Sequence, residues 1–138
     1  MNLKHDDNRI YIWMDWSSTP FWVPHEKDGV FLGNYDMYNE LPVELANRFK
    51  TYAMWFDNNK PGWGDENNQM DWDLYDSYGK TLACDLKKLF PEMRIFYGHI
   101  TNKDLIEIEL RIRHEEFEET VCVSKKIDPV DYSKLEEI

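Results

Sequence analysis

The chain has 138 residues and a net charge of -11, with 27 acidic side chains against 16 basic ones. One domain with a single core is expected at this length. The large negative net charge repels the phosphate backbone of nucleic acids, which argues against nucleic-acid binding. No apolar run approaches the length that crosses a bilayer, and the N-terminus lacks a signal peptide's apolar region, so we expect a cytoplasmic protein without membrane contact.

The first predicted element is a strand over residues 9–15, buried on both sides. Its aliphatic and aromatic side chains are expected on opposite faces: Ile10, Ile12 and Met14 against Tyr11 and Trp13. Prolines, glycines, asparagines and aspartates then punctuate residues 16–40, a pattern that predicts a long loop.

A first helix is predicted over residues 42–57. Pro42 suits its first turn, and Glu44 in that turn is favoured by the helix dipole. An apolar stripe at helical spacing defines its core face: Leu45, Phe49, Tyr52, Ala53 and Phe56.

A second helix is predicted over residues 72–90, with Asp71 as its N-cap. Its apolar stripe also follows helical spacing: Trp72, Tyr75, Gly79, Leu82, Leu86 and Leu89. A glycine inside a helix costs about 1 kcal/mol relative to alanine, so Gly79 indicates that another element crosses closely there.

The remaining elements are predicted as strands: a buried one over 93–100, then a hairpin of 104–114 with 117–126. In the hairpin, Glu118 and Glu119 are available to neutralise Arg111 and Arg113. A helix over 103–119 is the alternative. Residues 1–8 and 127–138 are expected to be loosely ordered ends.

The order β-α-α-β-β-β predicts one α+β domain over residues 1–138. We expect a two-layer sandwich in which two helices pack on one face of a small, mainly antiparallel sheet. Cys84 and Cys122 follow no disulfide or metal-binding spacing, so two free thiols are expected.

Residues 57–76 concentrate six carboxylates against one lysine. Alternate oxygen-bearing residues from Asp65 resemble the spacing of a calcium loop, but Met70 occupies the position that needs glycine, and Asp76 the position that needs glutamate. The four histidines are scattered, without a zinc motif. We therefore expect no metal and no cofactor, with calcium in this segment as the alternative.

The sequence contains no motif for nucleophilic catalysis or phosphate binding. Because the chain has 27 acidic residues, some pair of carboxylates is expected to lie close together in any fold, and such a pair is weak evidence of catalysis. A non-catalytic protein is therefore favoured over an unrecognised enzyme.

Tryptophans in predicted loops either fold back over the sheet edge or anchor a partner. The expected partner-binding residues are two aromatic anchors and five acids that steer a basic partner: Trp22, Trp63, Asp65, Glu66, Asp71, Asp73 and Asp76. Asp71 has the alternative role of capping its own helix.

Several motifs of the chain together resemble a family of small acidic bacterial proteins. The motifs are Asp15-Trp16-Ser17-Ser18 with Trp22, Leu41-Pro42 with Glu44-Leu45, and Trp72-Asp73 with Gly79, Leu82-Ala83 and Leu86. In the family they read D-x-S-S-x-x-x-W, L-P-x-x-E-L and W-[DE] followed by G-x-x-L-A-x-x-L, and this chain departs from the second motif by having one residue, not two, between Pro42 and Glu44. The match covers about residues 10 to 98, so the C-terminal hairpin inherits nothing from it.

Members of this family mostly lack an assigned function, but they are similar in character to immunity proteins of contact-dependent growth inhibition. The resemblance implies that the chain neutralises a bacterial toxin. Since nuclease toxins present Lys and Arg for phosphates, a basic toxin domain is the expected partner. The alternative is a non-catalytic binding module for a peptide, a carbohydrate or a regulatory protein.

Overall fold

The computed structural model describes residues 8–14, 19–24, 32–60, 70–98, 105–114 and 118–126, with only the backbone for residues 24, 32–34, 111–114, 118–122 and 124–126. In chain order the elements of this part are β1 (Arg9–Ile12), β2 (Phe21–Pro24), β3 (Leu32–Asn34), the 3-10 helix η1 (Tyr38–Glu40), α1 (Val43–Asn59), α2 (Trp72–Leu89), β4 (Arg94–Tyr97), β5 (Ile106–His114) and β6 (Glu118–Lys126).

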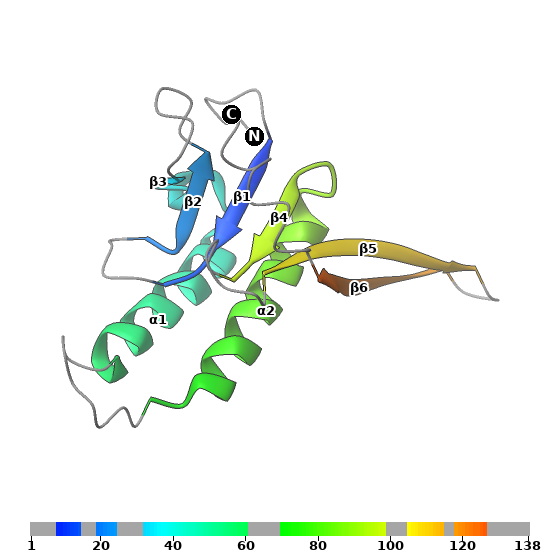
Figure 1. Ribbon diagram of the computed structural model, residues 1–138. Coiled ribbons are helices and arrows are strands. Elements are labelled where there is room, and N and C mark those ends of the chain that lie inside the picture. The colour runs from blue at the N-terminus through cyan, green and yellow to red at the C-terminus, as the bar shows by residue number, and fades with distance from the viewer. Residues whose placement is uncertain are drawn as a thin grey trace.

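The described strands form one sheet in the order β3-β2-β1-β4-β5-β6. β1 and β4 run parallel, and all other neighbouring strands are antiparallel. Both helices pack on one face of this sheet (Figure 1). The predicted class, an α+β protein with two helices on one face of a mainly antiparallel sheet, is therefore confirmed.

The prediction of a loop over residues 16–40 was wrong in part, because β2 and β3 lie within that range. β2 has four residues and β3 has three, so neither carries enough alternation to be recognised in the sequence. Pairing defines them: Tyr11 of β1 lies opposite Trp22, and Trp22 lies opposite Asn34 of β3. The sheet is thus extended on one side of β1, first by β2 and then by β3.

Both predicted helices are confirmed to within two residues of their ends. α1 follows Pro42, which occupies the N-cap position, and α2 follows Asp71. The backbone N–H of Leu74 donates to Asp71 Oδ1 at 2.9 Å, which confirms Asp71 as the N-cap. An ion pair of 2.7 Å between Arg48 and Asp85 joins the two helices on their outer side.

The two faces of β1 belong to different clusters, as its alternation predicted. Ile10, Ile12 and Met14 join the main core beneath the helices. Tyr11 and Trp13 face the other way and form a second buried cluster with Phe96 and Leu105. β1 is therefore the central strand that the sequence indicated, buried on both sides.

Gly79 of α2 lies where the helix meets two tyrosines of the core. A Cβ atom built on Gly79 would overlap the ring of Tyr97 and would lie 2.8 Å from the hydroxyl oxygen of Tyr52. The expected close crossing is confirmed: β4 supplies Tyr97, and α1 supplies Tyr52. A side chain at this position would have to displace buried aromatic rings.

Gly79→Ala is expected to lower the free energy of unfolding by about 1–2 kcal/mol, because an overpacking cost of up to about 3 kcal/mol exceeds the roughly 1 kcal/mol gained in helix propensity. Urea denaturation measures the difference. Lys80→Ala is the matched control, since Lys80 is exposed on the same helix. A Gly79→Ala variant as stable as this control would contradict the close packing described here.

The C-terminal hairpin is confirmed as two strands, β5 and β6, paired over nine positions. The helical alternative for residues 103–119 is thereby excluded for Ile106–His114. The register places Glu119 opposite Arg113, but it places Val121 opposite Arg111 and Glu118 opposite His114, so only one of the two arginines lies directly opposite a predicted acid. β5 pairs with β4 at only three positions, so the hairpin leaves the sheet as a long ribbon (Figure 1).

Cys84 of α2 is disulfide-bonded, so the expectation of a free thiol is wrong for this residue. The chain contains one other cysteine, Cys122, in β6. α2 packs against both β5 and β6, a proximity that the distance between the cysteines in the chain does not reveal. Disulfides are typical of oxidising compartments, and the cytoplasmic location stays a prediction.

Candidate functional site

Three of the five predicted steering acids lie together at the start of α2. Asp71 caps the helix, while Asp73 and Asp76 follow within its first two turns, and all three residues are exposed. Residues three apart on a helix are neighbours on its surface, so Asp73 and Asp76 lie side by side. Within the described residues no ion pair joins any of the three to a cation. No cation in this part of the chain therefore neutralises their charge, although Asp71 accepts from the N–H of Leu74 and Asp76 accepts from the hydroxyl of Tyr97.

Two large apolar side chains are exposed among these acids. Trp72 is 43% exposed, and Leu74 is 45% exposed. Trp72 was expected in the core, but it is the first residue of α2, and its ring meets that of Tyr75 edge to face, at 5.4 Å between centroids. We call this surface the acidic helix start, comprising Asp71, Trp72, Asp73, Leu74 and Asp76.

The core beneath the acidic helix start is built from tyrosines. Tyr75 links α2 to the chain after β1: the N–H of Met14 donates to the Tyr75 hydroxyl oxygen at 2.8 Å. Tyr97 donates its hydroxyl to Asp76 Oδ1 at 2.7 Å, and Tyr52 fills the space beside Gly79. The pKa values of the Tyr52 and Tyr97 hydroxyls are raised well above the usual range, mainly because burial disfavours the phenolate. Both therefore act as neutral donors that hold the surface in place.

Trp22 lies on the opposite face of the sheet from the helices. Its ring stacks on Trp13, with centroids 4.7 Å apart, and its Nε1–H donates to the carbonyl oxygen of Trp13 at 3.2 Å. The same face carries a Tyr11–Phe96 stack with centroids 4.7 Å apart. The structure therefore separates the predicted anchor Trp22 from the acids of α2 by the thickness of the sheet and helix layer.

The other predicted site residues lie outside the described part of the chain. Trp63, Asp65 and Glu66 belong to residues 61–69, which end directly before Met70 and the N-cap of α2. The calcium-like spacing falls largely on the same residues. Along the chain, these residues therefore directly precede the acidic helix start.

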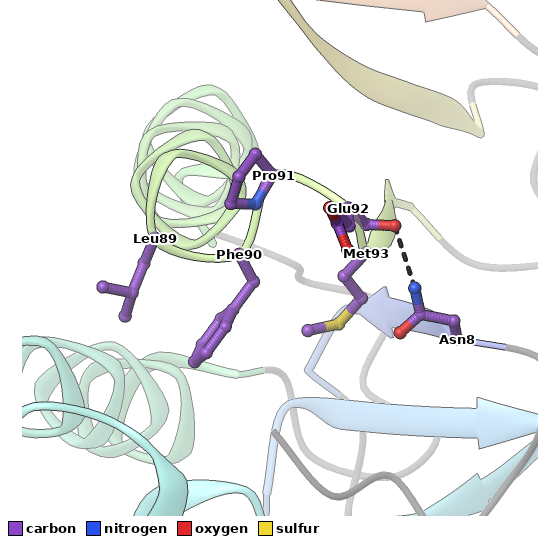
Figure 2. Close-up of a pocket in the computed structure, with 6 residues that line it drawn as sticks. All are labelled: Asn8, Leu89, Phe90, Pro91, Glu92 and Met93. Carbon is purple, nitrogen blue, oxygen red and sulfur yellow. Dashed lines mark hydrogen bonds between the residues drawn. The ribbon is translucent and has the colours of Figure 1, made fainter.

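A pocket of about 290 Å³ lies at the other end of α2, where the helix turns into β4 (Figure 2). Its lining consists of Asn8, Leu89, Phe90, Pro91, Glu92 and Met93. The Asn8 amide donates to the carbonyl oxygen of Glu92 at 2.8 Å and closes one side. Glu92 is the one titratable residue of this lining, so these residues offer no acid–base pair for catalysis.

The described residues include no group of three or more His, Cys, Asp or Glu side chains that could hold a metal ion. Nor does any helix in this part of the chain have the length and apolar character needed to span a membrane.

Fold and site together define an acidic two-layer α+β protein whose second helix begins with exposed carboxylates and apolar side chains. Comparison with protein-family models, curated proteins and solved structures finds no match.

Proposed function

We propose that the protein is a non-catalytic inhibitor of the immunity type, which binds a basic toxin domain through the acidic helix start and covers that toxin's active site. Three exposed carboxylates without a cationic partner in the described structure, next to exposed Trp72 and Leu74, carry the proposal. In the sequence, Asp65 and Glu66 shortly precede this surface, whereas Asp57 lies in α1 and is paired with Lys60 at 3.1 Å.

The acids and the apolar side chains have different roles in such an interface. Carboxylates attract a Lys- and Arg-rich surface over several ångströms and raise the association rate, while the desolvated aromatic ring slows dissociation. Trp72 is well suited to be that anchor, because its ring is partly held by Tyr75 and loses little freedom on binding. The same helix start thus supports both steering and anchoring.

An exposed tryptophan beside carboxylates also suits a sugar ring, and this observation supports the second candidate, a carbohydrate-binding module. A glycan array distinguishes the two candidates. Binding to a glycan that Trp72→Ala abolishes would favour the module, whereas the toxin inhibitor is expected to bind no glycan.

The proposal is tested with the Asp65→Lys/Asp73→Lys double variant. The partner is recovered by co-purification with the tagged protein from its source cells, and stopped-flow mixing then measures association. We expect the association rate constant to fall about 10-fold or more, since two attractive charges become repulsive. Added salt is expected to slow association of the unmodified protein and to have less effect on the variant.

The matched control is Glu44→Lys/Glu92→Lys, which changes the net charge equally at exposed acids outside the acidic helix start. Asp71 and Asp76 are left intact because Asp71 caps α2 and Asp76 accepts from Tyr97. Equal slowing by both double variants would show a general charge effect and contradict the site. Co-expression in a growth assay tests inhibition: the unmodified protein should rescue cells from the recovered toxin domain.

A further inference from the structure

β6 is the outermost described strand on one side of the sheet, and its far edge faces away from β5. It has nine residues and pairs with β5 along its whole length. β3, the strand at the opposite edge, has only three residues. Long edge strands carry a row of backbone donors and acceptors that can pair with another chain. β6 is therefore the sheet edge best suited to accept a further strand.

The sequence of β6, EETVCVSKK, is chemically self-complementary about its central residue, Cys122. Positions equally distant from Cys122 carry matching or opposite groups. The pairs are Val121 with Val123, Thr120 with Ser124, Glu119 with Lys125, and Glu118 with Lys126. Two antiparallel copies of this strand, centred on Cys122, would place each acid opposite a lysine and each valine opposite a valine.

The register with β5 assigns the two faces of β6. Ser124 lies opposite Ile108, which is buried in the core beneath the helices. Residues directly opposite one another in a sheet share a face, so the even-numbered positions of β6 lie on the helix side and the odd-numbered positions on the other. A twofold axis perpendicular to the sheet preserves these faces. The complementary positions of two copies therefore meet on the same side.

We propose that two copies of this chain associate edge to edge through β6, antiparallel and centred on Cys122, so that two six-stranded sheets become one continuous sheet. Four acid–lysine pairs and two valine pairs define the register. Within β6, a shift by two residues in either direction leaves no acid opposite a lysine. The same charges that stabilise the pairing thus exclude neighbouring registers.

Sedimentation velocity of the full chain tests the proposal with two complementary charge reversals. One variant is Lys125→Glu/Lys126→Glu, and the other is Glu118→Lys/Glu119→Lys. We expect the unmodified chain to dimerise and each variant alone to dissociate at least about 10-fold more readily, since like charges then lie directly opposite each other. An equimolar mixture of the two variants is expected to recover the dimer, because it restores all four pairs between chains.

The mixture also separates dimerisation from folding of the hairpin. The reversals alter the pairing of β6 with β5 as well, for example Lys125 with Glu107 and Glu119 with Arg113. Mixing cannot repair those pairs within a chain, so recovery in the mixture reports contact between chains. Lys80→Glu/Lys88→Glu on the exposed side of α2 is the control of equal charge change, and should leave the dimer intact. Three results would each overturn the proposal. They are an unmodified chain that is monomeric, a charge-reversed β6 variant that dimerises as well as the unmodified chain, and a mixture of the two β6 variants that stays monomeric.

Discussion

Replacing Tyr52 by alanine is expected to lower the free energy of unfolding by about 3–5 kcal/mol, the range for truncation of a large buried aromatic residue. Tyr52 is fully buried. Its ring lies against Tyr75 and Tyr78, with centroids 5.5 and 5.3 Å away, and it fills the space that Gly79 leaves open. Because Tyr52 lies on α1 and these three neighbours lie on α2, the cavity would lie between the two helices. Urea denaturation followed by circular dichroism measures the loss.

Tyr52→Phe separates the packing of the ring from its hydroxyl group. The hydroxyl donates to the carbonyl oxygen of Tyr75 over a long 3.4 Å, so its removal is expected to cost about 1 kcal/mol. Thr51→Ala, at an exposed neighbouring position of α1, controls for a change in helix composition. If alanine at position 52 costs no more than phenylalanine does, the ring does not occupy the packed position described here.

Alkaline pH is expected to unfold the protein cooperatively. Burial is the main cause of a raised pKa at four tyrosines of the described structure: Tyr35, Tyr38, Tyr52 and Tyr97. For Tyr35 and Tyr38 the pKa rises to about 12, and for Tyr52 and Tyr97 it rises further. Tyr35 also donates its hydroxyl to Glu40 at 2.6 Å, which favours its neutral form.

The sign of the effect follows from proton binding. Above pH 10 the unfolded chain releases its tyrosine protons while the folded chain keeps those of the buried hydroxyls, so the folded state binds more protons. The stability is complete below pH 10 and is lost as pH rises, by about 1.4 kcal/mol per pH unit for each buried tyrosine that stays protonated. Tyr52 and Tyr97 together give a slope of about 2.7 kcal/mol per pH unit.

A pH titration with two simultaneous signals tests this expectation. Absorbance at the tyrosinate band reports ionisation, and circular dichroism reports the fold. The buried tyrosines are expected to ionise only as the fold is lost, so part of the absorbance change should coincide with unfolding. Ionisation of all eight tyrosines near pH 10, with the circular dichroism unchanged, would show that Tyr52 and Tyr97 are accessible to solvent.

Much of the architecture could be predicted because its patterns are local. The alternation around Tyr11 indicates a strand buried on both faces, and the stripes through Phe49 and Leu82 indicate two amphipathic helices. The strict alternation from Ile106 to Arg113 indicates the C-terminal strand. β2 could not be predicted in this way, because four residues ending in Pro24 become a strand only through pairing with β1 and β3.

The candidate site was only partly predictable for a related reason. Asp71 could be identified as the N-cap from its position before an apolar stripe, and Gly79 as a point of close packing. The exposure of Trp72 could not be predicted, because its spacing in the helical stripe is that of a core residue. Trp72 is the first residue of α2, so no earlier turn of this helix lies beside its ring. The position of Trp22 depends on the sheet, since its pairing with Tyr11 sets the face it occupies.

The amino-acid sequence by itself determined the helices, the central strand, the C-terminal hairpin and the acidic character of the chain, because periodicity, capping and charge act over a few neighbouring residues. Only the tertiary structure decided which of these residues meet. It left Trp72 exposed at the start of α2, put Trp22 on the opposite face of the sheet, bonded Cys84 in a disulfide and left β6 at the sheet edge. Those outcomes depend on which segments far apart in the chain come into contact, and local sequence patterns do not indicate this.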